Sequence, residues 1–354
     1  MWQVVGQDKI LSLLDYGLKT DAIAHAYLLV GPGHVGKGTL AINLAQALNC
    51  EGSGPPCGQC RSCQRIRESK HADVTTIGLD SRTEIGVDDV RGLQLLANLP
   101  PYEGKCKVLI IDGAEYLSIE AANALLKILE EPPPRVVWLL LAAEEERLLP
   151  TVISRCQKLE LKPVPSERVQ VVLVNSYNVD GDKAKLLTQL CHGRLGWALS
   201  ALADGDMLEQ RSQRIDKLAS LLTAGIEQRF AYAQELASQF SQDRKAGLEI
   251  TEIWFDWWRD LMLIKGGCQE AIINVDFMAV LKEQAGRLSL TGIKEFLNNL
   301  GLLQEAISKN VNPRLALEWL MLNLPRREDP KHQVPGETKK AKARMQKRQA
   351  EIQE

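Results

Sequence analysis

The segment that most restricts how this chain can fold is an apolar run followed by a glycine-rich loop and a helical pattern. The run is Ala26-Tyr27-Leu28-Leu29-Val30, and the loop reads Gly31-Pro32-Gly33-His34-Val35-Gly36-Lys37-Gly38-Thr39. Small residues let backbone N–H groups turn around a phosphate, and a lysine at the start of a helix can reach the terminal phosphates of a nucleotide. The segment predicts a phosphate loop whose nucleotide-facing residues are Gly31, Gly33, Gly36, Lys37 and Thr39.

One position departs from the usual phosphate-loop pattern G-x-x-x-x-G-K-[ST]. Gly38 stands where a hydroxyl would bind magnesium, and Thr39 comes one residue late. On a helix, a shift of one residue turns a side chain by about 100 degrees. Two interpretations therefore stay open: a loop that binds ATP and Mg2+, and a phosphate loop that is kept as scaffold.

Short apolar runs alternate with helical patterns through residues 1–165. Runs without polar alternation are typical of parallel strands covered on both faces. There are three of them, at residues 26–30, 108–111 and 136–141. Leucines three or four apart are typical of helices with one apolar stripe, and they occur at residues 40–48 and 121–129. This alternation predicts a doubly wound α/β domain.

The second apolar run ends in Asp112, where phosphate-loop folds place a carboxylate that holds magnesium through water. Relatives that hydrolyse nucleotide follow this aspartate with a glutamate, and here Gly113 takes that place. Glu115 lies on the adjacent turn, and its position alone does not identify it as a catalytic base.

Four of the eight cysteines are clustered as a C-x6-C-x2-C-x2-C array: Cys50, Cys57, Cys60 and Cys63. Four thiolates from one short, turn-rich segment can surround zinc at about 2.3 Å per bond. Because four sulfur ligands leave no position for water, the array predicts a structural zinc site.

The chain beyond residue 165 has a different character. Residues 166–325 have helical patterns without a convincing strand run, and we divide them at about residue 205 into a small and a larger helical domain. Trp254, Trp257 and Trp258 belong to an i, i+3, i+4, i+7 stripe that is typical of a helix packed in a core or a subunit interface. Asn312-Pro313 predicts the start of a helix.

Composition excludes several classes of protein. With 45% hydrophobic and 25% charged residues, the chain is neither disordered throughout nor fibrous. The net charge of −2 argues against a general polybasic coat for nucleic acid, although residues 326–354 carry nine Lys or Arg against five Asp or Glu. We interpret that stretch as a mobile basic tail. Because no apolar run is long enough to span a bilayer and no signal segment is evident, we expect a cytoplasmic protein with no membrane contact.

Several motifs together resemble the AAA+ clamp-loader family over residues 1 to about 325. The most specific of them are Asn123-Ala124-Leu125-Leu126-Lys127-Ile128-Leu129-Glu130-Glu131-Pro132-Pro133 and Ser154-Arg155-Cys156. Others are Val5-Gly6-Gln7, His25-Ala26-Tyr27, the cysteine array and Asn312-Pro313-Arg314-Leu315-Ala316-Leu317-Glu318.

The resemblance implies a fold and a set of partners. We expect an AAA+-like α/β module at 1–165 with a zinc loop inserted at 50–63, a small helical lid at 166–205 and a helical collar at 206–325. The implied partners are gamma/tau-like motor subunits and a delta-like clamp-opening subunit in a hetero-pentamer. The sliding clamp and primed DNA are reached through that assembly.

Within this family the chain resembles a subunit that does not hydrolyse ATP. A motor subunit needs a magnesium-binding hydroxyl, a catalytic glutamate, a polar sensor and a sensor arginine. The matching positions hold Gly38, Gly113, Ala143 and Gly196. The resemblance implies that Arg155 is nevertheless kept as an arginine finger, which enters the ATP site of a neighbouring motor subunit in trans.

Two alternatives are also compatible with the sequence. Gly36, Lys37 and Asp112 are compatible with an ATP-hydrolysing motor subunit. The cysteine array and the basic tail are compatible with a zinc-based nucleic-acid module, although the small loop lacks interleaved aromatic residues.

Overall fold

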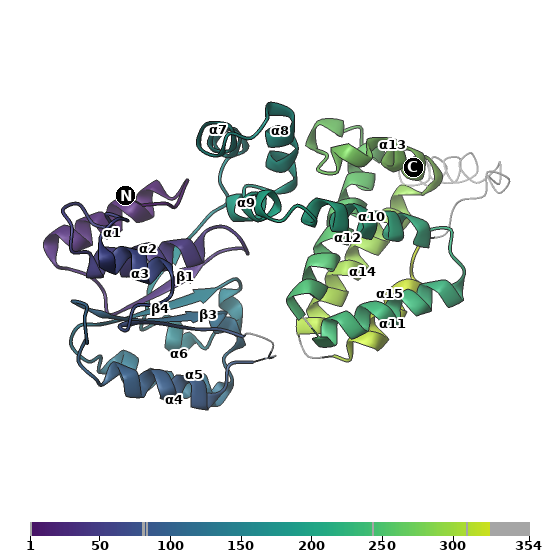
Figure 1. Cartoon of the computed structure of the whole chain (residues 1–354). Coiled ribbons are helices and arrows are strands. Elements are labelled where there is room, and N and C mark those ends of the chain that lie inside the picture. Colours follow the sequence, from purple (N-terminus) through teal and green to yellow (C-terminus); the bar gives the residue numbers. More distant parts are fainter. Residues whose placement is uncertain (1, 80–81, 83, 243, 309–310, 326–354) are drawn as a thin grey trace, which may run out of the picture. The chain divides into compact units, whose positions relative to one another are not determined.

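The structure is a computed structural model that describes residues 2–79, 82, 84–242, 244–308 and 311–325. The chain forms two compact units that divide between Gln210 and Arg211, and each unit is described by itself (Figure 1). The predicted basic tail at 326–354 lies outside the described residues.

The first unit is built around a parallel sheet of five strands. The strands are β1 (Ala26–Val30), β2 (Val74–Ile77), β3 (Lys107–Asp112), β4 (Val136–Ala142) and β5 (Gln157–Glu160). Their order is β2-β3-β4-β1-β5, and every neighbouring pair is parallel. All carboxyl ends therefore meet at one edge, with β4 between the strand that precedes the phosphate loop and the strand that ends in Asp112.

Helices cover both faces of this sheet (Figure 1). One face carries α1 (Asp8–Thr20), α2 (Lys37–Asn49) and α3 (Arg61–Arg67), and the other carries α4 (Val87–Ala97), α5 (Ile119–Glu130) and α6 (Pro150–Ile153). Alternate residues of β3 face the two layers: Val108 packs in the same cluster as Leu44 of α2, whereas Leu109 packs with Leu125 of α5. This arrangement confirms the predicted doubly wound α/β domain.

The three strands predicted from continuous apolar runs are the three inner strands β1, β3 and β4. Sequence reasoning missed β2 and β5, which lie at the two edges. The edge strand β5 buries only Leu159 among its four residues, so its sequence lacks the continuous apolar run that is typical of an inner strand.

Three further helices complete the first unit. They are α7 (Ser166–Tyr177), α8 (Gly181–Leu190) and α9 (Leu195–Ala203), and their core includes Val169, Leu187 and Ala198. Backbone contacts tie them to the α/β part: the N–H of Val164 donates to the carbonyl of Gly193 at 2.8 Å.

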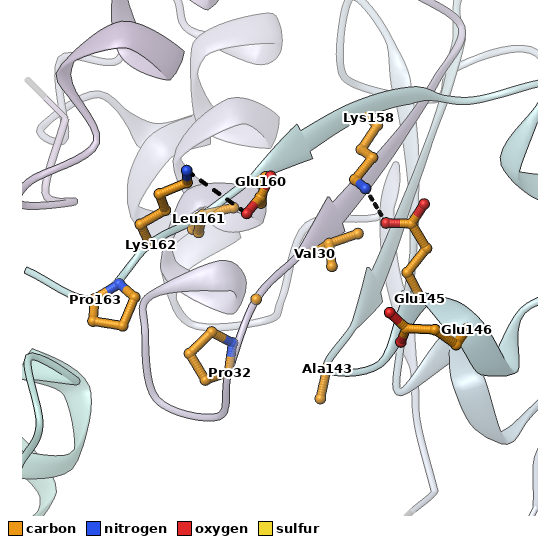
Figure 2. Close-up of a pocket in the computed structure, with 11 residues that line it drawn as sticks. Val30, Pro32, Ala143, Glu145, Glu146, Lys158, Glu160, Leu161, Lys162 and Pro163 are labelled. Atoms are coloured by element: carbon orange, nitrogen blue, oxygen red, sulfur yellow. Dashed lines mark ion pairs between the residues drawn. The ribbon is translucent and has the colours of Figure 1, made fainter. Parts of the chain in front are cut away.

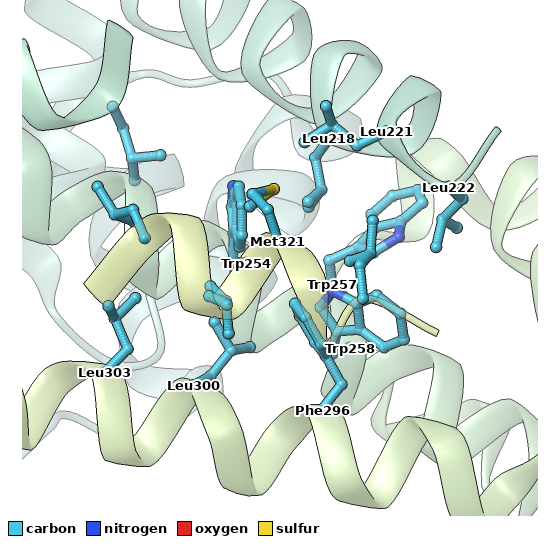
Figure 3. Packing of buried hydrophobic residues seen from close by; sticks show 14 of the residues in the cluster. Leu218, Leu221, Leu222, Trp254, Trp257, Trp258, Phe296, Leu300, Leu303 and Met321 are labelled. Atoms are coloured by element: carbon cyan, nitrogen blue, oxygen red, sulfur yellow. The ribbon is translucent and has the colours of Figure 1, made fainter. Parts of the chain in front are cut away.

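The described residues of the second unit form helices joined by turns, and they include no strand. Its helices are α10 (Met207–Leu221, which begins in the first unit), α11 (Ile226–Gln242), α12 (Arg244–Lys265), α13 (Met278–Arg287), α14 (Leu290–Ser308) and α15 (Pro313–Leu322). The predicted tryptophan stripe lies in its core, where Trp258 and Phe296 have ring centroids 4.3 Å apart (Figure 3). Asn312 caps α15 as predicted, because its side chain accepts a hydrogen bond of 3.0 Å from the N–H of Arg314.

Candidate nucleotide edge and zinc loop

The phosphate loop joins β1 to α2 at the carboxyl edge of the sheet. His34 has a φ of 60°, a left-handed conformation that is uncommon outside glycine. The ammonium of Lys37 turns back into the loop, where it donates to the carbonyl oxygens of Gly31 and, at 3.0 Å, of Pro32. A phosphate would have to take over these contacts before it could use this lysine.

The predicted Asp112 is exposed at the end of β3, and Ala143 follows the end of β4 beside it. The N–H of Gly113 donates to the carbonyl of Leu141 at 3.0 Å, which ties the two strand ends together. The fold thus brings Lys37 and Asp112 to the same edge of the sheet, as the sequence predicted. Between them, at the end of β4, the side chain is only the methyl group of Ala143.

Glu115 is a buried carboxylate at this edge that sequence reasoning left without a role. One of its oxygens accepts a hydrogen bond of 2.9 Å from the N–H of Ala143, and the other is buried without a hydrogen-bond partner. Burial raises the pKa of Glu115, although the nearby cations Lys37 and Arg147 act against this. Glu115 therefore bridges the turn after β3 to the end of β4.

Three glycines stand at the positions that the family resemblance matches to side chains needed by a motor subunit, and the space around them differs. A Cβ at Gly38 would meet open space, so a hydroxyl residue would fit there. Gly113 has a φ of 83°, which strains any other residue. A Cβ at Gly196 would lie 2.7 Å from the carbonyl oxygen of His34, so this position is closed against the phosphate loop.

A cavity of about 290 Å³ opens next to the phosphate loop (Figure 2). It is lined by Val30, Gly31, Pro32, Ala143, Glu145, Glu146, Lys158, Glu160, Leu161, Lys162 and Pro163. Lys158 is paired with Glu145, and Lys162 lies 3.9 Å from Glu160, as the dashed lines show. Because three carboxylates face two lysines that are already paired, the cavity does not favour an anion.

The four predicted zinc ligands come together. The sulfur atoms of Cys50, Cys57, Cys60 and Cys63 all lie within 4.8 Å of one another. Sulfur atoms at the corners of a zinc tetrahedron are about 3.8 Å apart for bonds of about 2.3 Å. The separation of 3.9 Å between the sulfur atoms of Cys57 and Cys63 agrees with that geometry. The residues therefore fit a structural zinc ion, which would join the end of α2 to the start of α3.

Backbone donors also favour thiolates in this cluster. The N–H groups of Cys60 and Gln59 lower the pKa of Cys57 to about 6, and the N–H of Cys60 lies 3.3 Å from that sulfur. Burial raises the pKa of Cys63 to about 12, and a bound cation would be needed to ionise it. The amide of Gln46 donates to the carbonyl of Cys63 at 2.8 Å and anchors the loop on α2.

Arg155 follows α6 and has a half-buried side chain. Its guanidinium donates to the carbonyl of Thr151 at 2.9 Å and to the hydroxyl of Ser154 at 3.3 Å, and it forms an ion pair with Glu130 at the end of α5. Glu130 and Arg155 belong to two separate sequence motifs. Their contact could not be foreseen from spacing, because 25 residues separate the two.

Known proteins are similar to this chain in both of its parts. The family described as "DNA polymerase III, delta subunit" matches residues 6–165, and "DNA polymerase III, delta subunit, C terminal" matches residues 206–325. The DNA polymerase III subunit delta' of Bacillus subtilis is 28% identical over 90% of this chain and 96% of its own length. The tau subunit of the same organism is 27% identical over 91% of this chain and 60% of its own length.

Among solved structures, that of a DNA polymerase III gamma subunit-related protein from Thermotoga maritima is similar to this chain. It is 18% identical, with a TM-score of 0.46 over 87% of this chain and 97% of its own length. Among the described residues, no helix is both long and apolar enough to cross a membrane.

Proposed function

This chain belongs to the DNA polymerase III delta-prime subunit family of clamp-loader proteins, and on that premise we propose that it acts in trans. It supplies Arg155 to the ATP site of a neighbouring gamma/tau-like motor subunit and hydrolyses no ATP itself. A delta-like subunit completes the hetero-pentamer, which places the sliding clamp on primed DNA.

The main support for the proposed lack of ATP hydrolysis is the lack of space for a side chain at Gly196. A motor subunit would direct a sensor arginine from this part of the lid to the nucleotide. Here the backbone of Gly196 contacts His34 of the phosphate loop, so a longer side chain has no room without moving the lid. Gly38 and Gly113 remove the magnesium-binding hydroxyl and the catalytic carboxylate as well.

The position of Arg155 supports a role toward another chain. It is partly exposed, with a third of its side chain accessible to solvent. A guanidinium beside a transferred phosphoryl group neutralises developing charge, an effect worth about 10³ to 10⁵ in rate. This corresponds to about 4 to 7 kcal/mol of activation free energy.

The cysteine cluster supports a structural zinc ion in the same subunit. Bound there, zinc would supply a cross-link between α2 and α3, and the four sulfur ligands leave no site for catalytic water. We propose no step of ATP hydrolysis that passes through this metal.

Reconstitution of the complete clamp loader tests the arginine. Arg155→Ala is expected to lower the DNA-stimulated ATPase rate strongly while leaving assembly of the pentamer unchanged. Arg91→Ala is the matched control, because Arg91 is also a partly exposed arginine beside a carboxylate of its own chain, Asp88. An Arg155→Ala complex with the ATPase rate of the control would contradict the proposal.

The second candidate function is an ATP-hydrolysing motor subunit. The similarity to a tau subunit over 91% of this chain favours it, and so does the retained Lys37. Equilibrium binding of a labelled ATP analogue to the isolated chain, followed by a turnover assay, separates the two. Turnover that is lost in Lys37→Ala would support the motor.

A further inference from the structure

We propose that Glu130 is a positioning residue for Arg155: it holds the guanidinium in the orientation in which it meets the neighbouring ATP. This inference rests on the proposed function, because it assumes that Arg155 acts in trans. It adds a residue on another helix, whose removal should impair the arginine without removing it.

The contacts of Arg155 divide into two groups. Thr151 and Ser154 belong to the same short helical turn as the arginine, so they move with it. Glu130 is the last residue of α5, and among the described residues it is the one hydrogen-bonding partner of the guanidinium from a different element. It therefore fixes the direction of the side chain relative to the body of the α/β part.

The place of Glu130 in its helix is unfavourable without the arginine. The carboxyl end of a helix carries partial negative charge, and a carboxylate in the last turn is destabilising by about 0.3–1 kcal/mol. Helix stability therefore does not account for a glutamate at this position. The guanidinium of Arg155 compensates the charge and gives the carboxylate a specific partner.

The geometry leaves the arginine able to bind a phosphate at the same time. A guanidinium has five N–H donors. The hydrogen bonds to described residues use two on Nη1 and one on Nη2, so the Nε–H and one Nη2–H remain for an outside acceptor. Glu130 can thus stay bound while the other edge of the fork contacts a phosphoryl oxygen.

An arginine side chain has about 2 kcal/mol of rotamer entropy, so without anchors it samples many orientations. Its planar guanidinium can stabilise a phosphoryl group only in the correct orientation. Misplacing a catalytic group by about 1 Å can cost about 100-fold in rate. Loss of one of three anchors should cost less than loss of the arginine. We expect Glu130→Ala to lower kcat of the assembled loader about 10-fold, less than Arg155→Ala does.

The experiment compares Glu130→Ala, Glu130→Gln, Glu131→Ala, Arg155→Ala and the Glu130→Ala/Arg155→Ala double variant in the reconstituted loader. Glu131 is the matched control, because it is the adjacent glutamate and its side chain makes no hydrogen bond or ion pair within the described residues. Steady-state kinetics give kcat and KM for ATP, and size-exclusion chromatography checks assembly.

Positioning predicts a specific pattern. Glu130→Ala lowers kcat with KM unchanged, Glu130→Gln recovers most of the rate because its amide oxygen still accepts the hydrogen bond, and Glu131→Ala matches the wild type. The double variant is no slower than Arg155→Ala alone.

The experiment distinguishes failure of this inference from failure of the proposed function. A low rate for Arg155→Ala with a wild-type rate for Glu130→Ala overturns this inference and leaves the proposed function standing. A wild-type rate for Arg155→Ala overturns both. A double variant that is slower than Arg155→Ala by the full Glu130 effect also overturns the inference, since Glu130 would then act without the arginine.

Discussion

The backbone N–H of Gly196 donates a hydrogen bond of 3.0 Å to the carbonyl oxygen of His34. This contact joins α9 (Leu195–Ala203), the last of the three helices that follow the α/β part, directly to the phosphate loop through backbone atoms. His34 itself is held at a φ of 60°. The start of α9 and the phosphate loop therefore support each other's backbone.

Gly196→Ala is expected to destabilise the protein by about 1–3 kcal/mol, as an added methyl group does in a closely packed site. In an ordinary helix this change would be stabilising by about 1 kcal/mol. Here the methyl would meet a backbone carbonyl at 2.7 Å, which cannot move away as a side chain can. Thermal unfolding measures the effect, and Gly38→Ala, a site with open space around its Cβ, is the control. Equal melting temperatures for the two variants would contradict the close contact.

The sequence predicted the elements at this edge better than the contacts between them. Continuous apolar runs predict the inner strands, and Asn312-Pro313 predicts the start of a helix, because both signals are local in the sequence. The edge strand β5 (Gln157–Glu160) has three exposed residues and no such signal. The contact of Gly196 with His34 depends on how α9 packs against the phosphate loop, and no local sequence pattern encodes that distance.

The candidate site divides in the same way. Cysteine spacing predicted the four ligands, since they lie in one short loop, and the structure brings their sulfur atoms within 4.8 Å of one another. The pairing of Glu130 with Arg155 and the bridge from Glu115 to Ala143 join distant segments. Tertiary packing sets such pairs, so neither residue type nor spacing predicts them.

Glu115→Gln is expected to change how stability depends on pH. Burial raises the pKa of Glu115 in the folded protein, so the fold favours the protonated form. The wild type should then lose stability as pH rises from the ordinary glutamate range through the raised pKa, and the variant should lack this loss. The size should be on the order of 1–3 kcal/mol, the cost of a buried polar group without a partner.

Urea unfolding of both proteins at a series of pH values measures this difference. The free energy of unfolding of the wild type, minus that of Glu115→Gln, should fall as pH rises and then level off. A difference that is constant with pH would show that Glu115 titrates normally. Glu120→Gln, an exposed glutamate in the first turn of α5, is the control.

Asp73→Asn is expected to destabilise the α/β part by about 1–3 kcal/mol. Burial alone would raise the pKa of Asp73, but the N–H groups of Tyr102, Gly104 and Glu103 donate to its carboxylate at 2.7–2.8 Å and lower it. An asparagine would present an NH2 group to at least one of these donors.

The sign of the pH dependence follows from the lowered pKa. The stability contributed by Asp73 is present above the ordinary aspartate range and is lost as pH falls through the lower folded-state pKa. The difference between the wild type and Asp73→Asn should therefore shrink in acid. Asp88→Asn, whose side chain is 93% exposed, should show neither effect, and a similar loss in both variants would refute the prediction.

Removal of zinc is expected to unfold the cysteine loop and destabilise the α/β part. Metal analysis of the purified protein should give about one zinc per chain, and Cys60→Ser should lower it. Cys60→Ser is the sharpest choice, because it removes a metal ligand without removing a helix cap. The Cys60 sulfur caps α3 (Arg61–Arg67) by accepting the N–H of Cys63 at 3.4 Å, and a serine hydroxyl can accept the same hydrogen bond. A seven-residue helix is too short to persist without such anchors.

Limited proteolysis locates the effect of the metal. After chelation, cleavage should begin within residues 50–63, whereas the holo protein should resist it there. Cys268→Ser is the control, because Cys268 is an exposed cysteine outside the cluster and should keep both the metal and the resistance. Since metal ligands must be deprotonated, zinc should also be released on acidification, together with the fall in stability. A chain that held no zinc yet resisted cleavage as well as the loaded protein would mean that hydrogen bonds such as Gln46 to Cys63 hold the loop without a metal.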